Sequence, residues 1–454
     1  MVRQNTRFIC DRCGAESAQW HGKCNACGEW NTLVEFRAPS GRSRAPRPMA
    51  SAAMPVSLTA AAAQKHERRR IGLSEVDRVL GGGLVPGAFV LLAGDPGIGK
   101  STLLLQSASS FAENHGACLY ASGEESLGQV AMRLRRLEPI GGQLLFLAET
   151  DVSAVEEQVA QVKPQLLVVD SIQSLHSPDS AALPGSPSQV RDCATRLLRV
   201  AKEVGVPTFL VGHVTKDGSV AGPRLLEHMV DTVLSLEGDP HSGHRVLRST
   251  KNRFGSTDEI GLFQMTEKGL EGVPDASAAL LAERRAGVPG SSVAAAVEGS
   301  RPLLVEIQAL VSAAPAYGSP RRSVTGVDYD RTCLILAVLE KRAGLSLVSQ
   351  DVFVNVPGGI KVTEPALDLG LALAVASSVR EQALPADMAC IGEVGLTGEI
   401  RGVPRLGARL SELGRRGFRR CLVPAGAGVA GGNGMSLVGV EHVHQAFEVA
   451  FADA

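Results

Sequence analysis

The chain has 454 residues, 44% of them hydrophobic and 20% charged, which is the composition of an ordinary folded protein long enough for two or three domains. No apolar run approaches the roughly 20 residues that span a bilayer, and the first residues lack the hydrophobic segment of a signal peptide, so we expect a cytoplasmic protein with no membrane partner. The net charge of −1 divides unevenly, since the first 70 residues carry 12 Lys and Arg against 5 Asp and Glu and the remainder carries 34 against 42, a pattern that suits either a polyanion-binding arm or a solubilising tail.

A cysteine-rich module is predicted over residues 1–36. Its four cysteines follow the pattern C-x2-C-x10-C-x2-C, with a glycine after each pair: Cys10, Cys13, Cys24 and Cys27. Two such pairs complete the tetrahedral four-thiolate shell that zinc favours, and four protein ligands leave no open position for a reaction. We therefore predict a structural Zn²⁺, with a redox pair as the alternative. The other five cysteines lie mostly among apolar residues, where we expect core positions: Cys118, Cys193, Cys333, Cys390 and Cys421.

Residues 37–66 form a predicted linker. The segment is dominated by Ala, Pro, Arg and Ser, and it lacks the large apolar residues that would offset the entropy lost on ordering.

Residues 67–272 form a predicted α/β domain. Four nearly continuous apolar strands, at 89–94, 118–123, 166–170 and 207–212, alternate with stretches of helical pattern. Such strands indicate a mostly parallel sheet with helices on both faces.

A phosphate-binding loop joins the first strand to the next helix. The stretch GDPGIGKST fits the pattern G-x-x-x-x-G-K-[ST]. Its glycines let backbone N–H groups surround phosphates, its lysine reaches the β and γ phosphates, and its serine can ligate Mg²⁺. The predicted nucleotide-binding residues are Gly94, Asp95, Pro96, Gly97, Ile98, Gly99, Lys100, Ser101 and Thr102.

Three later strand ends carry candidate catalytic groups. The strand at 166–170 ends in Asp170, a second candidate for holding Mg²⁺, at a spacing from the loop that allows one intervening strand–helix unit. Glu124 and Glu125 follow the strand at 118–123, and we favour Glu124 as the carboxylate that activates water. His213 follows the strand at 207–212 as either a phosphate sensor or a structural residue.

Two cations occur close together in the stretch STKNRFGST. In a strand, Lys251 and Arg253 would project from the same face before the chain turns at Gly255. Either these cations contact phosphates, or they are solvated side chains at the end of a strand.

A second α/β block is predicted over residues 273–454. We expect strands near SSVAAAVEG and LLVEIQALVS, helices near YDRTCLILAVLEKR and ALDLGLALAVASS, and a hairpin at GEVGLTGEIRG.

The four-cysteine module, GDPGIGKST, YASGEES, LLVVDSIQSL, GHVTKDG and KNRFG, in this order, closely resemble the RadA (Sms) family of bacterial DNA repair proteins. The resemblance implies a RecA-like ATPase core that hydrolyses ATP and works as a hexameric, DNA-stimulated motor in recombination. It also implies single-stranded and branched DNA as partners, with branch migration as the activity, and recombinase or replication-repair proteins as possible partners of the zinc module. In the family, Glu124 matches the catalytic glutamate, and Lys251 and Arg253 match cations that act at a subunit interface. Further candidates for contacts with DNA or a neighbouring subunit are Lys216, Arg224 and Arg331.

The C-terminal block resembles the proteolytic domain of Lon, which uses a Ser–Lys dyad. This chain has Ala366 where the serine would align, and Gly407 or its neighbours where the lysine would lie. Because alanine is no nucleophile, we expect a scaffold with a DNA-contact surface rather than a protease. Two alternatives to the motor are a Lon-like ATP-dependent protease and a nucleotide-switched assembly protein without motor activity. Weak candidates for the DNA-contact surface are Arg301, Arg321, Arg322, Arg331, Lys341 and Arg342.

Overall fold

The computed structural model describes residues 6–10, 15–37, 67–137, 142–180, 182–213, 226–238, 243–315, 319–427 and 434–452. The chain divides into two compact units. The first consists of Met1–Glu237, Leu247–Thr257 and Thr266–Leu270, and the second of Gly238–Val246, Asp258–Met265 and Glu271–Ala454. Each unit is described here by itself.

The N-terminal module is a small antiparallel sheet in the order β2-β1-β3, built from β1 (Thr6–Cys10), β2 (Glu16–Ser17) and β3 (Leu33–Arg37). Its buried core consists of Cys10, Cys24 and Leu33, with Phe8 and Ala15 against them. So few apolar side chains bury little surface, and we infer that a bound metal is needed to hold the module together.

A nine-stranded sheet forms the centre of the first unit, in the order β12-β11-β10-β9-β4-β8-β7-β5-β6. The neighbours from β9 to β6 pair in parallel, as the apolar strand pattern predicts. The strands are β4 (Phe89–Gly94), β5 (Cys118–Ser122), β6 (Leu144–Ala148), β7 (Leu166–Asp170), β8 (Thr208–His213), β9 (Thr232–Glu237), β10 (His244–Asn252), β11 (Ile260–Thr266) and β12 (Gly269–Gly272).

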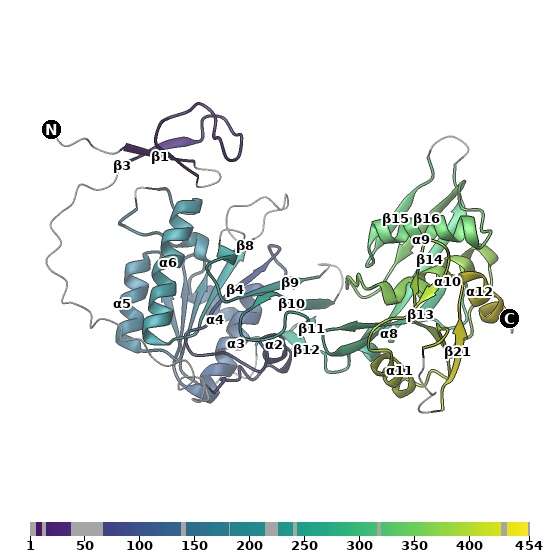
Figure 1. Ribbon diagram of the computed structural model, residues 1–454. Helices are drawn as coiled ribbons and strands as arrows, with labels where there is room; N and C mark the ends of the chain where they lie inside the picture. Colours follow the sequence, from purple (N-terminus) through teal and green to yellow (C-terminus); the bar gives the residue numbers. More distant parts are fainter. Residues whose placement is uncertain are drawn as a thin grey trace, which may run out of the picture. The chain divides into compact units, whose positions relative to one another are not determined.

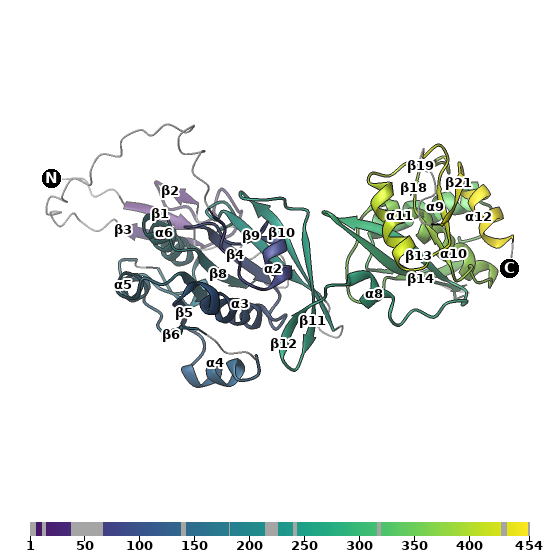
Figure 2. The same ribbon diagram turned by 90° about the horizontal axis from the view of Figure 1, so that it is seen from below.

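Helices cover both faces of this sheet (Figures 1 and 2). The odd-numbered residues of β4, β5 and β7 pack with α5 (Val152–Val162) and α6 (Pro187–Val204) in one hydrophobic cluster. Because strand side chains alternate, the even-numbered residues point to the opposite face, which α3 (Lys100–His115) covers. The remaining helical segments of this unit are α2 (Ser74–Val79), α4 (Leu127–Leu134) and the 3₁₀ turn η1 (Ile172–Ser174).

One expectation about strand order was wrong. The spacing between the phosphate-binding loop and Asp170 was expected to hold one strand–helix unit, whereas it holds two, β5–α4 and β6–α5. The strand that was missed, Leu144–Ala148, is the edge strand of the sheet and is only partly buried.

The second unit contains a seven-stranded sheet in the order β15-β16-β14-β13-β17-β20-β21. One face packs against α9, α10 and α12, and the other packs against α11. The strands are β13 (Ser291–Glu298), β14 (Arg301–Ala313), β15 (Arg322–Thr325), β16 (Gln350–Asn355), β17 (Met388–Cys390), β20 (Arg420–Pro424) and β21 (Ser436–Val440). The helices are α8 (Ala276–Leu281), α9 (Tyr329–Arg342), α10 (Asp368–Arg380), α11 (Leu406–Arg415), α12 (Val443–Phe451) and the 3₁₀ turn η2 (Pro365–Leu367).

The expected hairpin is present as β18 (Glu393–Val394) paired antiparallel with β19 (Ile400–Arg401). The two expected helices correspond to α9 and α10, and Asp328 caps the first of them by accepting a hydrogen bond from the backbone of Arg331. Among the described helices, none has the length and apolarity to cross a membrane.

Candidate nucleotide site

The phosphate-binding loop lies at the carboxyl edge of the nine-stranded sheet. β4 ends at Gly94, and the next residues form the loop that leads into α3 at Lys100. Gly94, Gly97 and Gly99 all have positive φ, a backbone conformation that side-chain-bearing residues rarely adopt. At Gly94 a Cβ atom would also come within 2.5 Å of the carbonyl oxygen of Leu236. The glycines are therefore required for the loop to fold as it does.

Parallel pairing brings the other candidate residues to the same edge. Asp170 at the end of β7 pairs in register with Ser122 at the end of β5, and His213 at the end of β8 pairs with Gly94. Glu124 follows β5 by two residues. The side chain of His213 lies outside what the structure describes, so its role stays a prediction.

Lys100 is the buried cation of the site. Its Nζ donates hydrogen bonds to the carbonyl oxygens of Gly94, at 2.8 Å, and Asp95, at 2.9 Å. Burial lowers its pKa, and the negative charges of Asp170, Asp95 and Glu124 partly oppose that shift. The amino group of the loop lysine is therefore held by carbonyl oxygens of the loop itself.

The two carboxylates of the site are held by hydroxyl groups that sequence reasoning missed. Tyr120 donates to Oδ2 of Asp170 at 2.6 Å, and Ser171 donates to Oε1 of Glu124. Strand alternation held a signal for the first contact, because Tyr120 and Asp170 are both even-numbered positions of neighbouring strands and share the α3 face. No sequence signal pointed to the second contact.

Glu124 and Glu125 have different surroundings. Glu125 forms a two-pronged ion pair with Arg133, with one nitrogen–oxygen distance of 2.9 Å. Glu124 is exposed and accepts from Ser171, beside the charge of Lys100. The geometry therefore favours Glu124 over Glu125 as the group that activates water.

The two cations of STKNRFGST contact the same short segment but in different ways. β10 ends at Asn252, so Arg253 follows the strand, and the expectation that one strand carries both residues was wrong by one position. Lys251 Nζ donates to the carbonyl oxygens of Glu227, at 2.6 Å, and Val230, at 2.8 Å. The side chain of Arg253 is 58% exposed and reaches the carboxylate of Asp231 through one nitrogen at 3.4 Å.

The cysteine module brings three of its four predicted ligands together. The sulfur atoms of Cys10, Cys24 and Cys27 lie within 4.8 Å of one another, with Cys10 and Cys27 at 3.6 Å. Zinc–sulfur bonds of about 2.3 Å in a tetrahedron place sulfurs about 3.8 Å apart, so the cluster fits this metal. Cys13 lies outside the described residues. Of the other five cysteines, four are buried as expected and Cys333 is partly buried.

The Lon-like unit has no nucleophile at the aligned positions. Ala366 is buried in η2, and Gly407 lies on α11. The fully buried Arg409 of α11 forms an ion pair with Glu364, the residue before η2, and donates to the carbonyl oxygen of Ala295 at 2.6 Å. A structural ion pair therefore stands beside the place where the dyad would lie.

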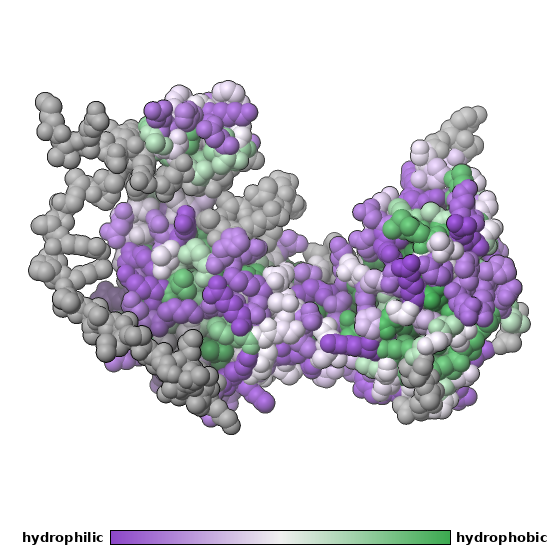
Figure 3. All heavy atoms as spheres, viewed as in Figure 1, coloured by the Kyte–Doolittle hydropathy of each residue, from purple (hydrophilic) through white to green (hydrophobic). Residues whose placement is uncertain are grey.

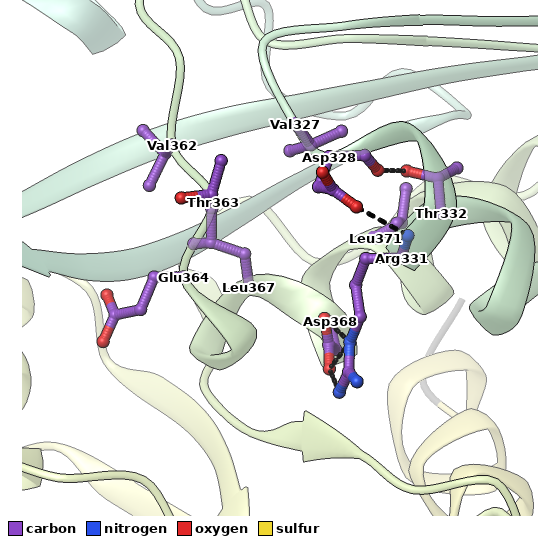
Figure 4. A pocket seen from close by; sticks show the side chains of 10 residues that line it. All are labelled: Val327, Asp328, Arg331, Thr332, Val362, Thr363, Glu364, Leu367, Asp368 and Leu371. Atoms are coloured by element: carbon purple, nitrogen blue, oxygen red, sulfur yellow. Dashed lines mark hydrogen bonds and ion pairs between the residues drawn. The ribbon is translucent and has the colours of Figure 1, made fainter. Parts of the chain in front are cut away.

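Arg331, a candidate for DNA contact, is engaged inside the second unit. Its guanidinium binds both carboxylate oxygens of Asp368 (Figure 4). It also reaches the carboxylate of Glu393 at 3.2 Å. Arg331 lines two cavities, one of about 20 Å³ and one of about 310 Å³, with its guanidinium held by these carboxylates. These contacts favour a structural role for Arg331.

The other cationic candidates divide by exposure. Arg301 donates to the carbonyl oxygens of Val273 and Pro274, and Arg322 donates to that of Leu347. Arg321, Lys341 and Arg342 are exposed. Lys216 and Arg224 lie outside the described residues.

Three family models match parts of the chain. They are described as AAA domain, over residues 62–219, rubredoxin metal binding domain, over residues 8–35, and subunit ChlI of Mg-chelatase, over residues 320–427. The first of these matches begins inside the predicted linker of residues 37–66.

Curated proteins match nearly the whole chain. A DNA repair protein RadA of Halalkalibacterium halodurans is 47% identical over 455 residues, which cover 99% of each chain. A DNA repair protein RadA of Bacillus subtilis is 48% identical over 453 residues, or 98% of each chain. Among solved structures, a KaiC-like protein of Pyrococcus horikoshii covers 46% of this chain and 100% of its own, at 21% identity and a TM-score of 0.39, a likeness too low to support a conclusion.

Proposed function

The chain belongs to the RadA family of DNA repair proteins, and from this premise we propose that it is a DNA-stimulated ATPase motor of recombination and repair. As such it binds single-stranded and branched DNA and drives branch migration of recombination intermediates, working as a hexameric ring. The observation that carries the proposal is the meeting of three groups at one edge of the parallel sheet: Lys100 is hydrogen-bonded to the carbonyl oxygens at the end of β4, Asp170 ends β7, and Glu124 follows β5 and accepts from Ser171.

Each group of the site has a defined task in ATP hydrolysis. Lys100 and the loop N–H groups bind the phosphates, for which Lys100 exchanges one of its two carbonyl contacts. Ser101 and Asp170 are the residues that would hold Mg²⁺, which neutralises charge on the phosphates when bound. Glu124 accepts the proton of the attacking water. Because the Lys100 ammonium group then contacts the phosphates directly, phosphate binding depends on the positive charge of Lys100.

Arg253 is suited to act on a neighbouring subunit. It is the more exposed of the two cations, and a guanidinium binds phosphate oxygens through two parallel hydrogen bonds. Arginines supplied by a second protein or subunit stabilise the charge of phosphoryl transfer in related ATPases. Lys251, with two carbonyl contacts, holds the segment from which Arg253 projects.

A ring needs contact surfaces, and the second unit exposes large apolar side chains. Leu310, Val348 and Leu396 are each more than 60% exposed. On the face of this unit drawn in Figure 3, hydrophobic areas lie among hydrophilic ones. Burial of such areas between subunits supports assembly.

The test is ATP turnover with and without single-stranded DNA, for the wild type, Lys100→Ala and Arg253→Ala. We expect DNA to accelerate wild-type turnover, Lys100→Ala to lose hydrolysis, and Arg253→Ala to lose the acceleration. Wild-type turnover that ignores DNA would instead support a nucleotide-switched assembly protein.

A further inference from the structure

Two hydroxyl groups connect the carboxylates of the nucleotide site in a reciprocal way. Tyr120 belongs to β5 and donates to Asp170, which ends β7. Ser171 follows β7 and donates to Glu124, which follows β5. Each strand therefore supplies one carboxylate and also the hydroxyl group that holds the carboxylate of the other strand.

Both hydroxyl groups are deeply buried. Tyr120 is 1% exposed and Ser171 is 0% exposed. An ionised carboxylate only accepts hydrogen bonds, so each hydroxyl is the donor and points at its carboxylate. The direction of both bonds is thus fixed by chemistry.

The two bonds leave different atoms available. The tyrosine contacts Oδ2 of Asp170, and within the described residues Oδ1 has no hydrogen-bond partner. A carboxylate fixed through one oxygen presents the other in a single direction, which suits metal binding. Ser171, by contrast, donates to the exposed carboxylate of Glu124. In the proposed function this carboxylate accepts a proton from the attacking water.

We propose that Tyr120 and Ser171 are positioning residues with separate tasks: Tyr120 orients Asp170 for Mg²⁺, and Ser171 orients Glu124 toward the attacking water. The proposal rests on the proposed function only in the roles that it gives to Asp170 and Glu124. Neither hydroxyl touches nucleotide, and each acts through its carboxylate.

The competing explanation is purely structural. A buried tyrosine hydroxyl needs some acceptor, and Asp170 could merely be the nearest one. A structural role predicts that loss of the hydroxyl lowers stability and reduces all kinetic parameters alike. Separate positioning tasks predict effects on different parameters.

The first experiment titrates Mg²⁺ while binding of a fluorescent ATP analogue is measured. For Tyr120→Phe we expect the half-saturating Mg²⁺ concentration to rise about ten-fold, the size of effect typical of a lost outer partner of a metal ligand. Turnover at saturating Mg²⁺ should stay close to that of the wild type. Tyr329→Phe, which removes an exposed hydroxyl from the other unit, is the matched control and should change neither quantity.

The second experiment measures ATP turnover for Ser171→Ala. We expect kcat to fall about ten-fold or more while the half-saturating concentrations of ATP and Mg²⁺ stay unchanged. Ser109→Ala is the matched control, because within the described residues this buried hydroxyl has no hydrogen-bond partner. It should leave kcat unchanged.

The proposal is overturned if Tyr120→Phe binds Mg²⁺ and nucleotide as the wild type does, or if both variants show the same uniform loss. Tyr120→Phe keeps the ring and so keeps the test available should Ser171→Ala fail to fold. The Mg²⁺ titration needs neither DNA nor strand movement. If DNA does not accelerate ATP turnover by the wild type, the proposed function is contradicted, but the Mg²⁺ titration can still test the roles of Tyr120 and Ser171.

Discussion

Arg409 and Glu364 form an ion pair inside the Lon-like unit, with the arginine side chain only 1% exposed and the glutamate 19% exposed. The glutamate also accepts from the backbone of Val297 at 2.6 Å, and the arginine donates to Pro404 at 3.1 Å. The pair joins the turn that carries Ala366 to α11, so the region that would be catalytic in a Lon-type protease is fixed by charge and hydrogen bonds.

Arg409→Ala should destabilise the second unit strongly, because it leaves the partly buried Glu364 carboxylate without its charged partner. Removal of one member of a buried pair typically costs roughly 3–5 kcal/mol. Chemical denaturation followed by circular dichroism measures the change. Arg401→Ala, which removes an exposed arginine paired with Glu399, is the control and should leave the unfolding midpoint nearly unchanged. Equal effects of the two variants would contradict this account.

Substitution of Lys251 should lower protein stability, whereas substitution of Arg253 should lower DNA-stimulated ATP turnover. Lys251→Ala removes two partly buried hydrogen bonds to backbone carbonyl oxygens and should cost on the order of 1 kcal/mol of stability. Arg253→Ala should leave stability nearly unchanged and lower DNA-stimulated turnover about a hundred-fold or more, as expected for a cation that stabilises phosphoryl transfer. Melting curves and turnover on the same preparations check both statements. A large loss of stability in Arg253→Ala would show that its role is structural.

Stability should fall at alkaline pH because of the buried thiols. Burial raises the pKa of Cys118 from its ordinary value of 9.0 to about 12. Between these values the unfolded chain loses the proton and the folded chain keeps it, so the free energy of unfolding falls as pH rises. At pH 10 one such thiol accounts for a loss of about 1.4 kcal/mol relative to pH 7.

Comparison of variants isolates this effect. Cys118→Ala should show a smaller loss of stability between pH 7 and pH 10 than the wild type, by about that amount. Val168→Ala, which removes buried apolar atoms from the neighbouring strand without a titrating group, should keep the wild-type pH dependence. If the free energy of unfolding changed equally with pH in all three proteins, the raised pKa of the buried Cys118 thiol would be contradicted.

Much of the fold was predictable because its signals are local. Apolar strand patterns predicted the parallel sheet, and the phosphate-binding loop was predicted from its glycines and Lys100. Contacts between distant side chains were harder to predict. Strand alternation placed Tyr120 and Asp170 on one face, but their contact also depends on strand register, and no sequence signal pointed to the contact of Ser171 with Glu124. Arg331 illustrates the same limit. Its charge suggested DNA contact, whereas α10 places Asp368 against it.

Zinc removal should unfold the N-terminal module alone. We expect one Zn²⁺ per chain by mass spectrometry under native conditions, and loss of that ion in Cys24→Ala. The ATPase sheet has its own core, so nucleotide binding should persist in the variant. Loss of nucleotide binding together with zinc would show that the two parts depend on each other for folding. A wild type that carries no zinc would contradict the metal assignment itself.

The central claim is that ATP hydrolysis drives strand movement, and branch migration on a labelled three-stranded DNA intermediate tests it most directly. We expect the wild type to extend the heteroduplex with ATP, and to bind the DNA without extending it when given a non-hydrolysable analogue. Glu124→Gln should bind both ATP and DNA and move no strands. Equal heteroduplex extension by the wild type and Glu124→Gln, or with ATP and the analogue, would contradict the account.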